Sequence, residues 1–282
     1  MPPQLQALTQ FWSATRMDLQ AVLEAFDDQL RRRPQPDAPD GHVEHDAGVV
    51  RSIAGANGWS GVIWSHLDHA SADAAIAAQI SRFAELSRPW EWKHYSYDQP
   101  ADLPDRLLAA GFTAEPAEAL LVAEIAGLTL DAPAPRGVEL LAVVDEHGVE
   151  AVVAVHDEVF GGDHSAVGSA LRADLARRTN SAAAVVAWAG QTPIAAGRVE
   201  FHPGTDFASL WGGGTLSAWR GRGVFRSLVA HRATQASARG FRYLQVDASP
   251  DSRPILQRLG FVELATTTPF THPGGSGQRL EH

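Results

Sequence analysis

The chain has no cysteine and only one lysine among its 282 residues. Without cysteine it can form no disulfide and offers no thiolate ligand to a metal. No apolar run approaches the roughly 18 residues needed to cross a bilayer, so we expect no membrane partner. The first residues, Met1-Pro2-Pro3-Gln4, lack the charged start and apolar core of a signal peptide. We therefore expect a cytoplasmic protein.

Positive charge is scarce in the first half of the chain. Residues 1–134 carry 9 Lys and Arg against 19 Asp and Glu, whereas residues 135–282 carry 14 of each. The net charge of −10 argues against nucleic acid as the main partner, because phosphate backbones bind basic surfaces. We interpret the single lysine, Lys93, as a result of codon bias.

Hydrophobic periodicity and Gly/Pro breaks predict alternating helices and strands. The predicted helices are 5–33, 71–86, 103–110, 146–160, 166–178, 227–239 and 252–259. The predicted strands are 49–53, 61–64, 90–97, 119–125, 138–144, 182–188, 194–201, 207–216, 241–247 and 262–267. The Pro-rich segment 131–137 is the best linker, and it separates a first domain, 1–130, from a second, 138–275. Residues 276–282 form a tail that resembles part of a purification tag.

Two segments 149 residues apart share one spacing. Asp98 and Asp247 each end a predicted strand, and each is followed 13 positions later by a Gly-Phe pair, Gly111-Phe112 or Gly260-Phe261. Repeats of solenoid proteins are much shorter, about 20–50 residues. The spacing therefore indicates a duplicated domain.

The most informative stretch is Arg220–Arg226, which reads Arg-Gly-Arg-Gly-Val-Phe-Arg between a strand and a helix. Glycines let the backbone approach a ligand, the helix N-terminus carries partial positive charge, and arginines add full charges. This pattern predicts a phosphate site. The segment 149 residues earlier, Ser71–Ile76, has no arginine or glycine, and Asp73 stands where a phosphate would lie. We therefore expect a single site, in the second half.

The order strand, Arg/Gly turn, helix, strand and a short helix ending in Leu259-Gly260-Phe261 resembles the GNAT family of acyl-CoA-dependent N-acyltransferases. The family signature is Gln or Arg, two residues, Gly, one residue, then Gly or Ala. Arg220 and Gly223 fit it, whereas Phe225 departs at the sixth position. The resemblance covers Val138 to about Phe270, and the first half resembles a degenerate copy that lacks the phosphate loop.

The resemblance implies an α/β (α+β) fold with two GNAT-like domains, each a mixed, mostly antiparallel sheet flanked by helices. Acetyl-CoA, or another acyl-CoA, would lie where the sheet splays open, and Gly212–Gly214 would form the bulge that opens it. Its pantetheine arm would pair with a strand end, as an added strand does. The implied cofactor-binding residues are Thr215, Leu216, Arg220, Gly221, Arg222, Gly223, Val224, Phe225, Arg226 and Ser252.

Acyl transfer to an amine needs a base, a donor to the thioester oxygen and an acid for the leaving thiolate. Glu200 and Asp247 are the candidate catalytic residues, as bases. The other reading places Glu200 in solvent and makes Asp247 a helix cap. The Tyr that often serves as acid in the family, four residues before the closing Gly, is replaced by Leu256.

We expect no metal, because His66 and His69 have no third ligand near them in the sequence. The leading hypothesis is an N-acyltransferase, most simply an N-acetyltransferase, that acts on a small-molecule or peptide amine as a monomer or homodimer. The alternative is a non-catalytic CoA-binding sensor or interaction module, which the missing Tyr favours. Dinucleotide binding is disfavoured, since Arg226 occupies the third glycine position of that fingerprint.

Overall fold

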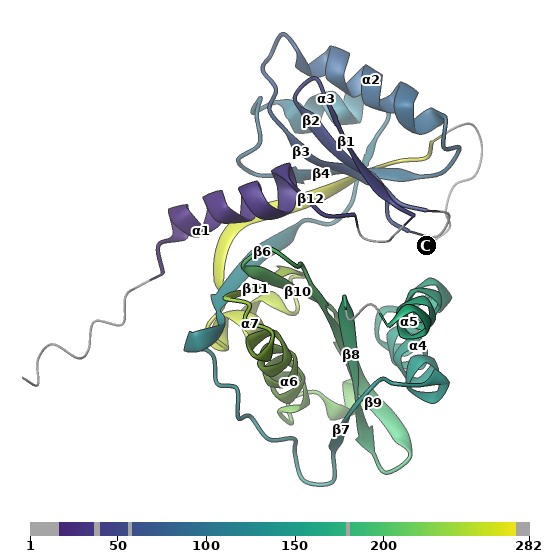
Figure 1. Ribbon diagram of the computed structural model, residues 1–282, viewed down its shortest axis with the longest axis vertical. Helices are drawn as coiled ribbons and strands as arrows, with labels where there is room; N and C mark the ends of the chain where they lie inside the picture. Colours follow the sequence, from purple (N-terminus) through teal and green to yellow (C-terminus); the bar gives the residue numbers. More distant parts are fainter. Residues whose placement is uncertain (1–16, 37–39, 56–57, 179–180, 275–282) are drawn as a thin grey trace, which may run out of the picture.

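One twelve-stranded sheet runs through the described part of the molecule, which comprises residues 17–36, 40–55, 58–178 and 181–274 of the computed structural model (Figure 1). The strand order is β1-β2-β3-β4-β12-β6-β11-β10-β9-β8-β7, and β5 pairs with β12 at the side. The strands are β1 (His42–Asp46), β2 (Val49–Ile53), β3 (Gly61–Ser65), β4 (Trp90–Tyr95), β5 (Thr113–Ala114), β6 (Glu118–Glu124), β7 (Glu139–Ala142), β8 (Ala182–Ala189), β9 (Thr192–Phe201), β10 (Phe207–Thr215), β11 (Tyr243–Ala248) and β12 (Val262–His272).

Helices cover both faces of this sheet. The α-helices are α1 (Leu19–Phe26), α2 (Ala72–Ala84), α3 (Leu103–Ala109), α4 (Glu146–Phe160), α5 (Ser165–Arg177), α6 (Val224–Ala238) and α7 (Arg253–Arg258). Three short segments complete the order: the π-helical η1 (Asp27–Arg32) and the 3₁₀ turns η2 (Ile125–Gly127) and η3 (Ser217–Trp219). None of the described helices is long and apolar enough to span a bilayer.

Most of the predicted elements are confirmed; the differences are one helix that changes type, two additional strands and one longer strand. The helix predicted over 5–33 begins at Leu19 in the described region and turns π-helical at Asp27, while 5–16 lie outside the described residues. Strands β1 and β5 were not predicted. The edge strand β1, His-Val-Glu-His-Asp, lacks the alternation of apolar and polar residues that predicts a strand, since none of its residues is fully buried. Strand β12 continues five residues past the predicted end, because its second part pairs with β4.

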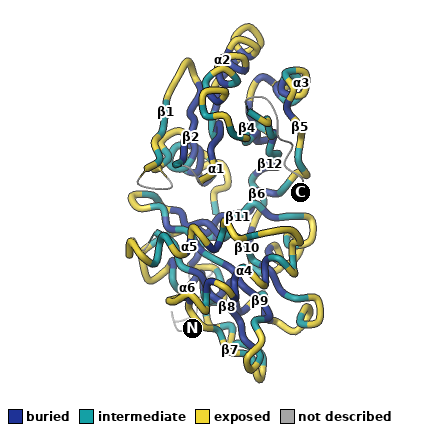
Figure 2. Tube along the Cα trace, turned by 90° about the vertical axis from the view of Figure 1, so that its right-hand side faces the viewer, coloured by how far each residue is buried: buried dark blue, intermediate teal, exposed yellow. Residues whose placement is uncertain are grey.

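Alternation along the strands of the second half separates its two layers. On β8, Val185 and Ala187 pack in the cluster beneath α6, while Val186 and Trp188 pack in the cluster beneath α4 and α5. Successive strand residues point to opposite faces, so α6 and the α4–α5 pair sandwich the sheet. Figure 2 shows the buried residues concentrated along these strands.

The two halves of the chain exchange a strand. Strand β6, from the first half, lies between β11 and β12 of the second half. In return, β12 lies between β6 and β4 and also pairs with β5. Figure 1 shows β12, in yellow, running from the second half up into the first. A single sheet therefore contains strands from both sides of the predicted linker 131–137. The division into domains 1–130 and 138–275 stays a prediction.

The repeated Gly-Phe motif has the same geometry in both halves. Gly111 and Gly260 follow the short helices α3 and α7 with φ of +94° and +107°. In each case the next N–H, of Phe112 or Phe261, donates to the carbonyl five residues back at 3.1 Å. Both phenylalanines are buried. This match supports the duplication inferred from the spacing.

Candidate functional site

Strands β10 and β11 diverge after a short parallel ladder. The two strands pair in parallel only from Phe207, opposite Tyr243, to Ser209, opposite Gln245. Strand β10 then continues to Thr215 and β11 to Ala248 without pairing to each other. The two strands are thus unpaired with each other beyond Ser209 and Gln245, as the resemblance implies for a sheet that splays open.

A glycine bulge bends β10 at this point. The register between β9 and β10 shifts between Trp211 and Gly214, and Gly212 has φ +55°. A Cβ atom on Gly212 would lie 2.6 Å from the His156 ring, so no larger residue fits. The His156 Nε2 lies 2.9 Å from the Gly212 carbonyl oxygen. The predicted bulge over Gly212–Gly214 is confirmed.

Two buried side chains hold the bulge from opposite faces. Burial lowers the pKa of His156 to about 4, against the opposing effect of the Gly212 carbonyl, so a neutral ring donates to that carbonyl. On the other face, Arg232 of α6 donates through Nη1 to the carbonyls of Arg198 and Trp211, at 3.2 and 3.5 Å. Burial lowers the Arg232 pKa to about 10, which leaves the guanidinium charged at neutral pH. Neither residue was identified from the sequence.

The end of β10 distinguishes the two strand residues predicted to bind the cofactor. The N–H of Leu216 donates to the Ile194 carbonyl on β9 at 2.9 Å, so this group is not available to a ligand. Backbone groups alternate between the two edges of an antiparallel strand, which turns the N–H of Thr215 toward the open side. Of the two predicted residues, Thr215 is therefore the one whose N–H has no partner on β9, and cofactor binding by Thr215 and Leu216 stays a prediction.

The turn after β10 exposes an unbroken series of backbone donors. Gly221 and Gly223 have φ of +74° and +90°, and α6 begins at Val224. Within the described residues, no protein acceptor receives the N–H groups from Gly221 to Arg226; the first to donate back is that of Ser227, to Gly223 at 3.1 Å. A Cβ on either glycine would meet nothing within 4 Å, so the turn faces open space. Such a row of free donors is a ready anion site.

The side chains of the turn anchor it. Val224 is buried, and Phe225 packs against the core between sheet and α6. Arg220 Nε donates to the Thr215 carbonyl at 3.1 Å, while the Arg222 guanidinium lies 4.9 Å from the centre of the Trp219 ring. The predicted Ser252 precedes α7, and its hydroxyl lies 3.1 Å from that of Ser249; within the described part of the chain it forms no hydrogen bond to the turn.

In the first half, Arg31 lies where the parallel strands β3 and β4 stop pairing. Strands β3 and β4 also pair in parallel, over two rungs, at Gly61 and Val62. Beyond them, Arg31 Nε donates to the Ile63 carbonyl at 2.9 Å, and its Nη2 binds Asp98 at 2.8 Å. Arg31 is 2% exposed. A guanidinium therefore occupies the strand edge where a ligand would pair.

The helix start in the first half is closed as well. The Asp68 carboxylate accepts the N–H groups of Ala70 and Ser71 at 3.0 and 2.8 Å, in front of α2. The prediction had assigned this blocking position to Asp73. Asp73 instead lies in the first turn of α2 and forms an ion pair with Arg106 at 2.8 Å, because α2 begins three residues earlier than the 149-residue offset implies.

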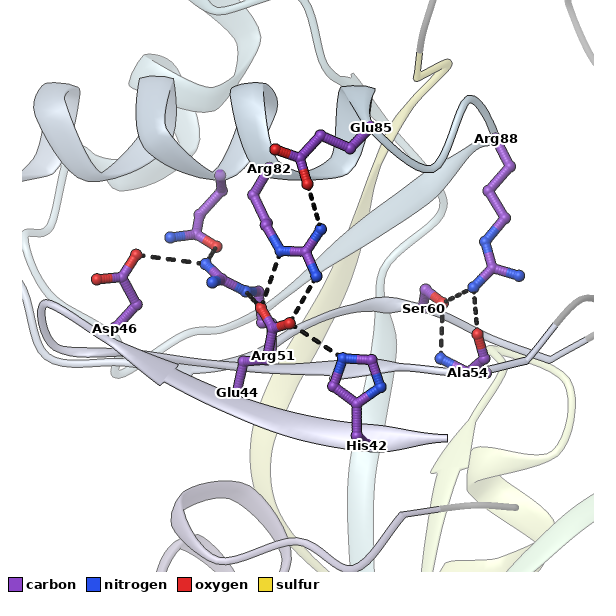
Figure 3. Close-up of polar contacts among 10 residues, drawn as sticks. His42, Glu44, Asp46, Arg51, Ala54, Ser60, Arg82, Glu85 and Arg88 are labelled. Carbon is purple, nitrogen blue, oxygen red and sulfur yellow. Dashed lines mark hydrogen bonds and ion pairs between the residues drawn. The ribbon is translucent and has the colours of Figure 1, made fainter. Parts of the chain in front are cut away.

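Ion pairs hold α2 against β1 and β2 (Figure 3). Glu44 of β1 binds Arg51 of β2 at 2.5 Å and Arg82 of α2 at 2.6 Å. The hydrogen bond from Arg82 is the main cause that lowers the Glu44 pKa, to about 2. Arg51 also donates to Gln79 of α2 at 2.7 Å. These charged side chains therefore bond one another and hold the elements of the first half together.

The two candidate bases lie on one face of the sheet but in different settings. Glu200 lies opposite Ser209 on a paired rung and accepts a hydrogen bond from Arg198 at 3.2 Å. Asp247 lies past the last rung, on the open part of β11, with a side chain 2% exposed. Its Oδ2 accepts from Lys93 Nζ, whereas its Oδ1 is buried without a partner. Asp247 is therefore part of an ion pair rather than a helix cap.

Lys93 was missed as a functional candidate. It comes from β4 in the first half, and its ammonium lies against Asp247 and 5.6 Å from the centre of the Trp211 ring. Burial is the largest single influence on the Lys93 pKa and lowers it, but Asp247, Tyr95 and Glu91 together outweigh burial and leave that pKa above its ordinary value. The available signal was that the chain's only lysine lies in a strand of alternating tryptophans, Trp90 and Trp92.

No group of three or more His, Asp or Glu side chains suited to a metal occurs among the described residues. His69 of the His-Leu-Asp-His segment instead lies 3.2 Å from Asp102.

Comparisons with known proteins agree with this geometry. Residues 149–261 match the acetyltransferase (GNAT) family. A comparison with curated proteins gave no match. Among solved structures, the chain is similar to a GCN5-related N-acetyltransferase from Kribbella flavida, at 19% identity and a TM-score of 0.64 over 91% of this chain and 95% of that one.

Two further structures also align along most of their length. A functionally unknown conserved protein from Staphylococcus epidermidis aligns at 15% identity and a TM-score of 0.64, over 88% of this chain and 97% of that one. A tandem GNAT protein from the clavulanic acid biosynthesis pathway aligns at 14% identity and a TM-score of 0.58, over 86% of each chain. The chain thus has a mixed α/β GNAT fold, and its residues 149–261 match the acetyltransferase (GNAT) family.

Proposed function

We propose that the protein binds acetyl-CoA in the cleft between β10 and β11 and transfers the acetyl group to a small-molecule or peptide amine. The observation that carries this proposal is the row of free N–H groups from Gly221 to Arg226 at the end of the opened strand β10. The donors, the dipole of α6 and the exposed arginines match a pyrophosphate in charge and in hydrogen bonding.

Thr215 has the next role. Its N–H faces the open edge of β10, where it is suited to pair with the pantetheine arm or to donate to the thioester oxygen. Acetyl-CoA supplies the activated acyl group, and the protein supplies position, charge and proton transfer. Glu200 and Asp247 remain candidate bases, with Glu200 held by Arg198 and Asp247 by Lys93.

We further propose that the protein has a single acetyl-CoA site and that the first half is a degenerate copy. Arg31 closes the cleft of that half, and Asp68 caps the start of α2. The similarity to a tandem GNAT protein supports this arrangement. We propose a cytoplasmic monomer or homodimer with no membrane or nucleic-acid partner.

A non-catalytic CoA-binding module is the second candidate. It is favoured by Leu256, which stands where the family often places an acidic Tyr and is 2% exposed in the core. A buried leucine can donate no proton to a leaving thiolate, so a catalyst must protonate the thiolate by another route.

Calorimetry with acetyl-CoA tests the binding site. Gly223→Asp should weaken binding about 100-fold or more, because it blocks donors and adds a negative charge. Gly240→Asp is the matched control: it has φ +84° and open space around its Cβ at the other end of α6, so it carries the same backbone strain. Equal affinity in the two variants would overturn the site assignment.

Turnover distinguishes the two candidates. Acetyl-CoA is incubated with a panel of primary amines, and released CoA is read with a thiol reagent, which meets no background because the chain has no cysteine. Release that depends on the amine supports the transferase. Tight binding without release across the panel supports the module.

A further inference from the structure

The exchanged strand β6 brings a carboxyl group to the mouth of the cleft. Strand β6 begins at Glu118, which lies opposite Thr267 on β12. Its neighbour Ala119 lies opposite Ala248, the last residue of β11. Glu118 is therefore beside the open end of β11, although it comes from the first half of the sequence.

Register places Glu118 on the same face as the Lys93–Asp247 pair. Leu120 lies directly opposite Asp247, and residues two apart on a strand share a face. Trp211 of β10 contacts the Lys93 ammonium from the far side of the cleft. Glu118 and Lys93 from the first half thus gather with Asp247 and Trp211 from the second where β10 and β11 diverge, and this group of residues is the mouth of the proposed cleft.

The charges at the mouth leave one carboxyl unmatched. Asp247 is neutralised by Lys93, and the nearby Glu91 accepts a hydrogen bond from Trp59 at 2.9 Å. Glu118 is half-buried, and among the described residues it has no recorded hydrogen bond or ion-pair partner. Burial raises its pKa to about 7, Asp247 and Glu91 add to the rise, and Lys93 opposes it. Half-burying an unpaired carboxyl costs stability, so packing gives no reason for it.

We propose that Glu118 is the base that takes a proton from the acceptor amine, so that the first half of the chain completes the active site of the second. This assignment rests on the proposed transferase function. The assignment also explains why the two halves exchange strands. Pairing of β6 positions Glu118 beside the proposed cleft, and pairing of β12 with β4 positions Lys93.

The proton balance is simple. Glu118 in its ionised form takes one proton from the acceptor ammonium, and the freed lone pair attacks the thioester carbonyl carbon. The C–N bond forms and the C–S bond breaks. The second proton of the nitrogen goes to the leaving sulfur, and Glu118 returns its own proton to water. A base that titrates near neutral pH is well matched to this step.

The other carboxylates are less suited to this role. Asp247 is already bound to an ammonium, and Glu200 lies on the closed part of the sheet beside Arg198. Only Glu118 combines a place at the mouth with the absence of a fixed partner among the described residues.

The test measures kcat/KM against pH for the full chain with acetyl-CoA and the best amine of the panel. The wild type should show kcat/KM rising to a plateau through a single ionisation near pH 7. Glu118→Gln should lower kcat/KM about 100-fold or more and remove that ionisation, while acetyl-CoA affinity stays within twofold. Glu118→Asp should recover part of the rate together with the ionisation.

Glu124→Gln is the matched control. Glu124 is at the other end of β6 and is paired with Arg242 at 3.0 Å, away from the cleft. It should leave both rate and pH profile unchanged. A Glu118→Gln variant that folds, binds acetyl-CoA and keeps the wild-type profile would overturn the role of Glu118 alone. Absence of amine-dependent turnover in the wild type would overturn the proposed function, and this assignment with it.

Discussion

Replacing Glu118 with Gln should make the protein more stable at alkaline pH. The folded protein raises the pKa of Glu118 from its ordinary 4.5 to about 7, chiefly by burial. Below pH 4.5 the carboxyl is protonated in folded and unfolded chains alike. As the pH rises from 4.5 to about 7, the unfolded chain ionises first and is favoured, so the wild type loses stability over this window. Gln cannot ionise and escapes that loss.

The size of the effect follows from the same interval. A rise from 4.5 to about 7 corresponds to at most about 3 kcal/mol. Glu118 is partly exposed, and solvent screening reduces the expected gain to about 1–2 kcal/mol. For a chain of this size, that is a rise in Tm of about 2–6 °C.

Thermal unfolding at pH 8.5 and pH 5.0 measures this gain. Glu118→Gln should unfold at a higher temperature than the wild type at pH 8.5, with most of the difference gone at pH 5.0. Glu124→Gln should show no such gain, because its carboxylate has an arginine partner. A Tm difference for Glu118→Gln that is equal at both pH values, or negative at pH 8.5, would refute the electrostatic reasoning.

Three further changes test the surrounding structure. Lys93→Met leaves Asp247 buried and unpaired and should cost about 3–5 kcal/mol in urea unfolding; adding Asp247→Asn should restore most of it, and purely additive losses would argue against the pair. Arg31→Met should cost a similar amount, because it leaves the buried Asp98 without its cationic partner. Calorimetry should still give one acetyl-CoA per chain, and a second bound acetyl-CoA would contradict the inference that Asp68 blocks the start of α2. Gly212→Ala forces a Cβ against His156 at a positive φ and should cost about 1–3 kcal/mol; a neutral effect would show that the bulge is easily rebuilt.

The local features of the site could be predicted from the sequence. The turn at Arg220–Arg226 and the bulge at Gly212–Gly214 contain glycines with positive φ, and such glycines can be recognised in the sequence itself. The Gly-Phe repeat likewise predicts two helix ends, and both contain the same hydrogen bond from the Phe N–H to the carbonyl five residues back. Local rules of this kind act within a few residues.

The long-range features could not be predicted. Strand β6 is buried along most of its length and β12 only at intervals, but neither pattern says whether a strand pairs within its own half or crosses to the other. The roles of Arg31, Lys93 and Glu118 all depend on that arrangement. The sequence thus predicts the half in which we propose that the cofactor binds, while only the fold brings Glu118 and Lys93 of the first half beside β11.

Backbone amide NMR tests the central claim, acetyl-CoA binding at the glycine turn, most directly. Adding acetyl-CoA to deuterated, ¹⁵N-labelled protein should shift the amides of Gly221 and Gly223 most strongly, together with that of Thr215. The amides of Ala70 and Ser71 in the first half should stay unchanged, since Asp68 already holds them. Shifts centred on Ala70 and Ser71, with Gly221 and Gly223 unmoved, would contradict it.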